Sequence, residues 1–138
     1  MKLRFALSAF AVTLSVAASA SAYDTTIPTS FDFTALNTTT NSEGWETDWE
    51  ARLESDSQQC IRNRRAQIIG TFDGERKVVD EDRSSRNGFI RLGDEGGPGQ
   101  AARLERLVAR VLEKRVGPSG HRHVCTSPDK IVQNFATR

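Results

Sequence analysis

The feature that most constrains the fold of this chain is a pair of cysteines, Cys60 and Cys125, which are its only cysteines. Two cysteines allow one intramolecular disulfide, and such a bond forms and persists in an oxidising compartment. Two free thiols or an intermolecular bridge are the alternatives. The destination of the chain therefore decides whether a covalent loop constrains the fold.

The N-terminus has the organisation of a secretory signal peptide. It consists of a basic start with Lys2 and Arg4, an uncharged apolar run over residues 5–18, and the small residues Ala20, Ser21 and Ala22. The apolar run is shorter than a membrane-spanning helix requires. We expect residues 1–22 to be a signal helix that is cleaved between Ala22 and Tyr23, which leaves a secreted, extracellular protein without a membrane span. An uncleaved membrane anchor is the alternative.

Residues 23–138 have the size of one small domain. In an oxidising compartment we predict that Cys60 and Cys125 form a disulfide within this domain. The chain-entropy model gives a loop of this length roughly 4 kcal/mol of stabilisation. That is comparable to the net stability of a small domain.

The charge of the chain is nearly balanced, with 19 Lys+Arg against 18 Asp+Glu. Nucleic-acid-binding domains usually carry a clear basic excess. We therefore expect no nucleic-acid partner. The many arginines, which alternate with acids, are interpreted as a solvated, salt-paired surface; they include Arg62, Arg64, Arg65, Arg83, Arg86, Arg103, Arg106, Arg110, Arg115 and Arg122.

Residues 44–54 (GWETDWEARLE) alternate between apolar and charged side chains. This period of two predicts a half-buried strand with Trp45, Trp49 and Leu53 facing a core. Thr47 is the polar exception on the inner side. The alternative is that the two tryptophans form a stacking platform for sugar rings or for a partner.

Further short strands are predicted on both sides of turn residues. Residues 64–71 and 77–80 form a hairpin around Asp73-Gly74, and residues 89–92 follow a turn at Asn87-Gly88. Residues 93–100 contain four glycines and a proline, which predicts a loop.

Residues 101–115 (AARLERLVARVLEKR) fit two patterns. An amphipathic helix is indicated by the spacing of Leu104, Leu107, Val108, Val111 and Leu112. A strand is indicated by the alternation of Leu107, Ala109 and Val111. The local pattern favours a short helix over residues 101–115, and the strand stays open because periodicity fails most often in short apolar runs.

The order of these motifs resembles that of a known family. Cys60 is followed by Arg64-Arg65 at the start of an apolar strand, by Asn87-Gly88-Phe89, by Ala109-Arg110-Val111 and by Cys125. This order is similar to that of secreted bacterial domains of actinobacterial type with a carboxypeptidase-regulatory-like or Cna-B-like fold. The resemblance covers residues 49–132. It implies a prealbumin-like β-sandwich in which the two cysteines tie the first core strand region to the last.

No arrangement typical of catalysis is recognisable, so we expect no enzyme, no cofactor and no metal. His121 and His123 could supply two metal ligands, but no third ligand is identifiable. Residues 80–88 have alternating oxygen-bearing side chains, yet they lack the glycine and the final glutamate of a calcium loop. We interpret both as polar loop segments.

Together these patterns predict a mainly β protein. A single β-sandwich is expected over residues 44–138, preceded by a flexible polar segment over residues 23–43 with an edge strand at residues 30–34. Such a module would act outside the cell or at its surface as a non-enzymatic binding or structural protein with a protein or carbohydrate partner. Its binding loops would be residues 93–100 and 117–123. The alternative is a small secreted inhibitor or effector that docks through the helix at residues 101–115.

Overall fold

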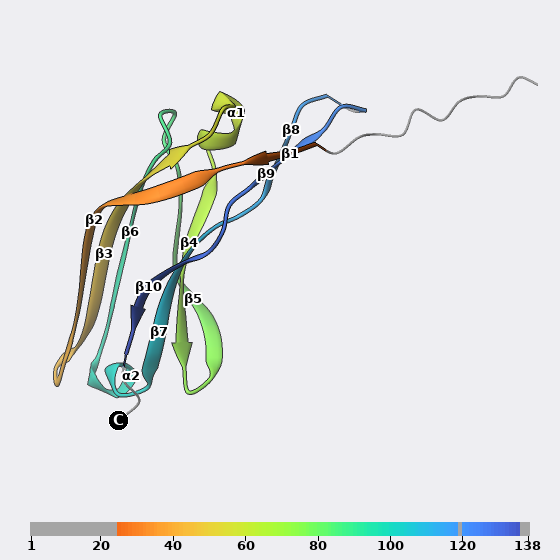
Figure 1. Ribbon diagram of the computed structural model, residues 1–138. Coiled ribbons are helices and arrows are strands. Elements are labelled where there is room, and N and C mark those ends of the chain that lie inside the picture. Colours follow the sequence, from red (N-terminus) through yellow and green to blue (C-terminus); the bar gives the residue numbers. More distant parts are fainter. Residues whose placement is uncertain (1–24, 119, 136–138) are drawn as a thin grey trace, which may run out of the picture.

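Strands dominate the computed structural model, which describes residues 25–118 and 120–135, and they build three sheets (Figure 1). The strands are β1 (Thr25–Pro28), β2 (Ser30–Asn41), β3 (Gly44–Glu54), β4 (Arg65–Phe72), β5 (Glu75–Arg83), β6 (Phe89–Gly96), β7 (Leu104–Val111), β8 (Lys114–Val116), β9 (His123–Thr126) and β10 (Lys130–Asn134). Two single-turn helices, α1 (Gln58–Ile61) and α2 (Pro98–Ala101), connect them. The mainly β fold class is confirmed.

Two of the sheets face each other as a β-sandwich. One has the strand order β2-β3-β6 and the other β10-β7-β4-β5. Their inner sides bury a single apolar core that consists of Phe31, Trp45, Trp49, Ala51, Leu53, Ala66, Ile68, Ile90, Leu92, Leu104, Leu107, Ala109, Val111 and Val132. Burial of this apolar surface is the main driving force for joining the two layers.

Strand β3 shows how alternation produces a core face. Trp45, Thr47 and Trp49 are at most 3% exposed, while the charged residues between them face solvent. The Thr47 hydroxyl is satisfied by the hydroxyl of Thr38 at 2.9 Å, which explains how a polar side chain is tolerated there. The predicted half-buried strand is confirmed, and the burial of both tryptophans excludes them as an exposed stacking platform.

The hairpin between β4 and β5 is also confirmed. Asp73 and Gly74 both have positive φ values, 51° and 80°, as the tight two-residue hairpin turn requires. Glycine adopts this conformation without steric cost and aspartate tolerates it. The turn therefore sets the register that pairs Phe72 with Glu75.

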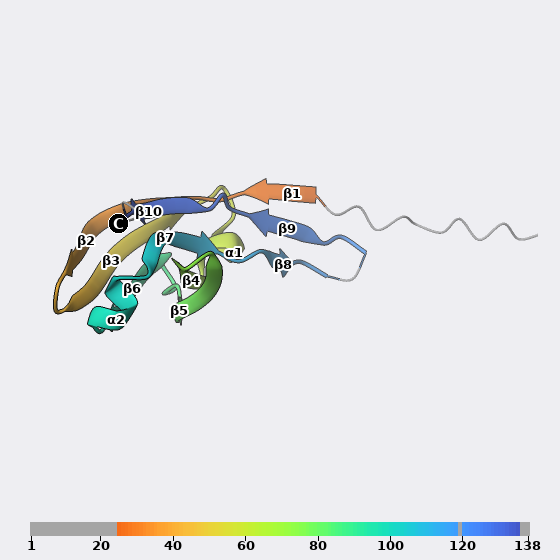
Figure 2. The same cartoon turned by 90° about the horizontal axis from the view of Figure 1, so that it is seen from below.

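The third sheet, with the order β1-β9-β8, extends from one end of the sandwich (Figures 1 and 2). Its strands continue strands of both layers: β1 leads into β2 through Thr29, β8 follows β7, and β9 leads into β10. β1 pairs with β9 in parallel, and β8 pairs with β9 antiparallel. This small sheet therefore joins the two layers at that end.

The N-terminal polar segment differs from our expectation for residues 23–43. The edge strand is present but is longer than predicted, because β2 pairs with β3 from Ser30 to Asn41. Residues 25–28 form β1. Threonine-rich sequences suit strands because the β-branched side chain fits the pleated surface, so this segment belongs to the sheets rather than to a flexible leader.

The helix favoured over residues 101–115 is wrong, because these residues contain the whole of strand β7, between the end of α2 and the start of β8. β7 lies between β4 and β10 and pairs with both. In the middle of the sheet, the outward Val108 is only 8% exposed between Ile131 and Ile69, so β7 carries apolar side chains on its outer face as well as the inward Leu107 and Ala109. That double burial produces an apolar run whose spacing imitates a helix.

The loop predicted over residues 93–100 is also mostly wrong. β6 continues to Gly96, and α2 begins at Pro98. A Cβ atom on Gly96 would collide with the side chains of Trp45 and Gln100, and one on Gly93 would lie 3.0 Å from the carbonyl oxygen of Thr47. These two glycines therefore allow close packing within regular structure.

Candidate functional site

An apolar row crosses the outer side of the sheet β10-β7-β4-β5. Ile131 is paired with Val108, Val108 with Ile69, and Ile69 with Val78, so the four side chains stand at successive cross-strand positions. None of them belongs to the core cluster between the sheets. We call these four residues the apolar row.

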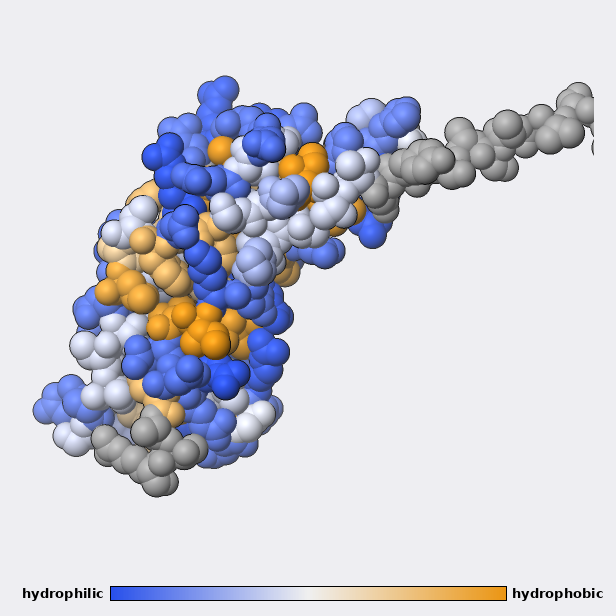
Figure 3. Space-filling model, in the orientation of Figure 1, coloured by the Kyte–Doolittle hydropathy of each residue, from blue (hydrophilic) through white to orange (hydrophobic). Residues whose placement is uncertain are grey.

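Exposure differs along the apolar row. Ile131 and Val78 are 57% and 45% exposed at its two ends, whereas Ile69 and Val108 are 5% and 8% exposed at its centre. Figure 3 shows an apolar area among hydrophilic side chains at mid-height, over β10 and β7. Adjacent apolar side chains that are exposed on the surface of a sheet are typical of protein interaction sites.

Arginines surround the apolar row. The register places their side chains on the same outer side as the row, and they are Arg65, Arg76, Arg83, Arg106 and Arg110. Glu81 and Asp129 are the acids of this side that form ion pairs, and Glu105 also lies at this surface. We call the outer side of this sheet, with its row and its arginines, the arginine face.

Two of these arginines are neutralised by the two acids. Arg65 Nε and Nη2 donate to the two Glu81 carboxylate oxygens at 2.9 Å each, and Arg110 Nη2 donates to Asp129 Oδ2 at 2.7 Å. Hydrogen bonds from Gln67 and from Arg65 lower the pKa of Glu81. The hydrogen bond from Arg110 lowers the pKa of Asp129. Both acids therefore stay ionised and remain paired with Arg65 and Arg110.

Arg76 and Arg106 have no ion-pair partner among the residues that the structure describes. Arg106 Nε donates to Asn134 Oδ1 at 2.9 Å, an uncharged acceptor. Arg76 and Arg106 line a surface hollow of about 690 Å³ together with Val108 and Ile131. Two acids, Glu105 and Asp129, line it as well, and Asp129 is engaged by Arg110. Cations and apolar surface are thus available side by side.

The outer side of the opposite sheet has the opposite sign. Its acids are Glu46, Asp48, Glu50 and Glu54 on β3 and Glu95 on β6. Its arginines are Arg52 and Arg91, and Arg91 is engaged by Asp48 at 3.2 Å and by Glu50 at 3.8 Å. The balanced overall charge of the chain therefore hides a separation of charge between the two faces.

A second hollow, of about 340 Å³, lies between β5 and the end of β6. Trp45 and Phe72 form its apolar part, and its rim carries charges of both signs, including Glu75, Lys77 and Arg103. The indole Nε1 of Trp45 is buried there without a hydrogen-bond partner. The mixed rim favours no charge class of ligand, so this hollow is less specific than the arginine face.

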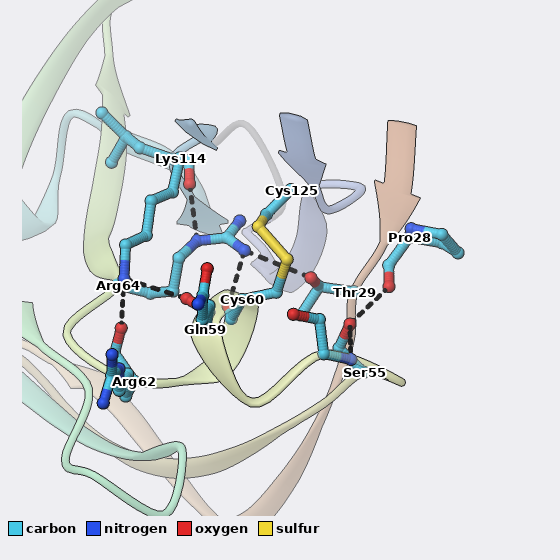
Figure 4. Close-up of a disulfide and its surroundings, with 11 residues drawn as sticks. Pro28, Thr29, Ser55, Gln59, Cys60, Arg62, Arg64, Lys114 and Cys125 are labelled. Atoms are coloured by element: carbon cyan, nitrogen blue, oxygen red, sulfur yellow. Dashed lines mark hydrogen bonds between the residues drawn. A yellow bond between two sulfur atoms is a disulfide. The ribbon is translucent and has the colours of Figure 1, made fainter. Parts of the chain in front are cut away.

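Cys60 and Cys125 are joined as a disulfide, as predicted (Figure 4). Cys60 lies in α1 and Cys125 in β9, and both are fully buried. The bond therefore ties the segment that follows β3 to the third sheet. Because both sulfur atoms are bonded to each other, neither provides a thiolate nucleophile.

Arg64 lies beside the disulfide and is fully buried, which corrects its assignment to a solvated surface. Its Nη1 donates to the carbonyl of Cys60 at 2.9 Å and to the hydroxyl of Thr29 at 3.1 Å, and its Nε donates to the carbonyl of Leu112 at 3.0 Å. Burial lowers the pKa of Arg64, and the charge of Glu113 opposes this shift. The guanidinium thus connects three segments that are distant in the sequence.

Lys114 completes the same cluster at its exposed side. Its ammonium group donates to the carbonyls of Gln59 at 2.9 Å and of Arg62 at 2.7 Å, at the end of α1. Burial and then the charge of Arg62 lower the pKa of Lys114. This cluster is explained by the support of α1 and the disulfide, so we assign it a structural role.

The remaining candidates from the sequence form no common site. In the described part of the chain, no group of three or more His, Cys, Asp and Glu side chains is placed to hold a metal ion. Asp80 and Asp82 instead accept hydrogen bonds from backbone N–H groups. The predicted cleavage site at Ala22 and Tyr23 lies outside the described residues.

The apolar row is not recognisable from the sequence. Its members come from four strands, and only the strand order places Ile131 and Val78 at the two ends of one line. A local signal exists, because Val78 follows Arg-Lys and Ile131 follows Asp-Lys, so each interrupts a charged stretch. That signal does not reveal that the two residues belong to one surface.

No helix of the described residues is both long and apolar enough to span a membrane. Comparisons of the chain with protein-family models, with curated proteins and with solved structures find no match.

Proposed function

We propose that the protein is a secreted, non-enzymatic binding module whose arginine face docks an acidic surface of another protein. The observation that carries the proposal is the apolar row framed by Arg76 and Arg106, which form no ion pair with any described residue. The secreted location rests on the N-terminal signal pattern and is compatible with the disulfide.

The charge of the arginine face sets the chemistry of the partner. Glu81 and Asp129 already occupy Arg65 and Arg110, so further carboxylates are attracted to the other arginines. Arginine suits this role because its planar guanidinium binds carboxylates through two parallel hydrogen bonds. Complementary charge raises the association rate and selects against basic partners.

The apolar row favours a protein over a carbohydrate as the partner. Ile131 and Val78 are aliphatic and exposed, and they would be buried against apolar side chains. Sugar rings are typically bound on exposed aromatic side chains, and Trp45 and Trp49 are buried in the core. A docking helix at residues 101–115 is not available, because these residues contain the whole of β7.

Site-specific cross-linking tests the proposal. The photoreactive residue p-benzoylphenylalanine replaces Ile131 in one form of residues 23–138 and Glu50, on the acidic face, in the control. Both forms are irradiated in the extracellular fraction of the organism that produces the chain. We expect a cross-linked protein with acidic surface residues from the Ile131 position only.

Two substitutions on the arginine face test whether cross-linking at position 131 depends on Arg76 and Arg106. Arg76→Glu with Arg106→Glu should abolish the product, while Arg52→Glu on the acidic face should leave it unchanged. Equal products from both cross-linker positions would overturn the proposal. So would retention on an anionic polysaccharide without any cross-linked protein, because the ligand would then belong to another class.

A further inference from the structure

Strand β2 is a sheet edge with an unusual composition. It is the outermost strand of the order β2-β3-β6, so the backbone groups on its outer edge have no partner strand within residues 25–118 and 120–135. No charged residue and no proline occur between Asp32 and Glu43. The free backbone of such an edge is a template for another strand.

The other sheet edges of the described residues are protected. In the third sheet, β1 has only four residues and ends at Pro28, and β8 carries Lys114 and Arg115. β5 has the sequence ERKVVDEDR, in which nearly every residue is charged. β10 begins with Lys130 and contains a register shift after Ile131, and β6 carries Arg91, Asp94 and Glu95. Charges and bulges of this kind prevent edge-to-edge association. β2 is therefore exceptional within its own molecule.

The unprotected part of β2 is its second half. The first half is covered near β10, where Lys130 pairs with Asp32 at 2.7 Å and lies over the ring of Phe31. A register shift between Phe33 and Ala35 separates this half from the rest. Beyond it, residues 35–41 are exposed except Thr38, and Leu36 is 45% exposed.

We propose that residues 35–41 of β2 pair antiparallel with the same residues of a second copy of this chain, joining two three-stranded sheets into one. When the same strand of two copies pairs, identical charges come close together and repel each other. Residues 35–41 carry no charge, so this repulsion is absent in any register. The four threonines of β2 also favour an extended backbone. A two-fold axis perpendicular to the sheet keeps Leu36 of both copies on the core side, where the added strand buries it.

This proposal is independent of the arginine face, and the expected behaviour in salt separates the two. Backbone pairing between uncharged strands is insensitive to salt, whereas docking on arginines is screened. Sedimentation equilibrium of residues 23–138 over a range of concentrations should show a monomer–dimer equilibrium at both low and high salt.

Lysine substitutions on β2 test the contact directly. Asn37→Lys with Thr39→Lys places like charges on both strands at exposed positions, and should raise the dissociation constant at least about tenfold, equivalent to 1.4 kcal/mol. The matched control, Asn37→Ser with Thr39→Val, should keep the dimer. Circular dichroism establishes that both variants are folded.

Val78→Lys separates this proposal from the proposed function. It changes the apolar row and should leave the dimer intact, whereas the β2 lysine variant should leave cross-linking at Ile131 intact. A monomer at every concentration would overturn the proposal. A dimer that tolerates both lysines, or amide exchange on β2 that does not slow with concentration, would overturn it equally.

Discussion

Arg64 shows how a single side chain can organise this fold. It is buried beside the disulfide and donates to backbone carbonyls of α1 and of the segment after β7, and to Thr29 between β1 and β2. These hydrogen bonds from Nε and Nη1 offset the cost of burying the cation, while its Nη2 has no hydrogen-bond partner among the described residues. Arg64 is buried while its neighbour Arg65 is exposed, because hydrogen-bond acceptors surround the side chain of Arg64.

Replacing Arg64 should destabilise the protein strongly. Arg64→Met removes the donors of three acceptors at once, and we expect a loss of about 2–4 kcal/mol in the free energy of unfolding. Arg65→Met is the matched control, because that neighbour is exposed and its ion pair is worth less than about 1 kcal/mol. Urea unfolding with the disulfide intact measures both, and equal losses would contradict the role of Arg64.

Asp129 should contribute a small pH dependence to stability. Its pKa is lowered from 3.8 by Arg110, so the pair stabilises the folded state above about pH 4. The contribution is lost as the pH falls through the lowered pKa. Because the pair is partly exposed, it should amount to less than about 1 kcal/mol.

The comparison of wild type with Asp129→Asn checks this expectation. The difference between their urea midpoints should be full at about pH 6 and should shrink steadily as the pH falls below about 4. Arg110→Met should show the same loss of pH dependence. A difference that stays constant down to the lowest pH would show that Asp129 acts through packing instead of charge.

At the scale of elements, β6 shows that glycines can serve regular structure. Gly93 is paired with Asp48 and Gly96 with Trp45, so both lie within the β3–β6 ladder. The absence of a side chain at Gly96 leaves room for the indole of Trp45 against the sheet. The end of the core is therefore closed by a rigid ring that fits only over glycine.

Adjacent glycines offer a sharp test of this packing. Gly96→Ala places a methyl group on the buried Trp45 and should cost about 1–3 kcal/mol of stability, as overpacking does. At Gly97 nothing lies within 4 Å of the new atom and φ is −72°, so Gly97→Ala should change stability by less than about 1 kcal/mol. Thermal unfolding followed by tryptophan fluorescence measures both; similar shifts would refute the close-packing argument.

At the scale of the whole molecule, the disulfide joins two segments that are far apart in the sequence. It closes a loop over a sequence separation of 65 and links α1 with the third sheet. That sheet consists of short strands with little core of its own. The covalent bond and the Arg64 cluster therefore hold it against the sandwich.

Reduction should remove a large share of the stability. The chain-entropy model assigns roughly 4 kcal/mol to a loop of this length. Urea unfolding with and without reductant should show a loss of that order. The double variant Cys60→Ser with Cys125→Ser should resemble the reduced protein and should not respond to reductant; a response would reveal an effect unrelated to this bond.

Local patterns were sufficient where one face of a strand is buried and the other is solvated. The alternation of Trp45, Trp49 and Leu53 predicted β3, and Asp73-Gly74 predicted the β4–β5 turn, because each signal resides in adjacent residues. The pairing of two lone cysteines was also predicted from their number and from the signal-peptide pattern expected at the N-terminus.

Tertiary structure decided the features that depend on neighbours distant in the sequence. Residues 104–111 are a strand because β4 and β10 supply backbone partners on both sides. Gly96 lies in a strand because it pairs with Trp45, whose indole occupies the space that a side chain on residue 96 would need. The apolar row exists only once four strands are aligned in register. The physical reason is that side-chain periodicity depends only on the residues of one segment, whereas strand pairing, close packing and surface composition depend on contacts between segments.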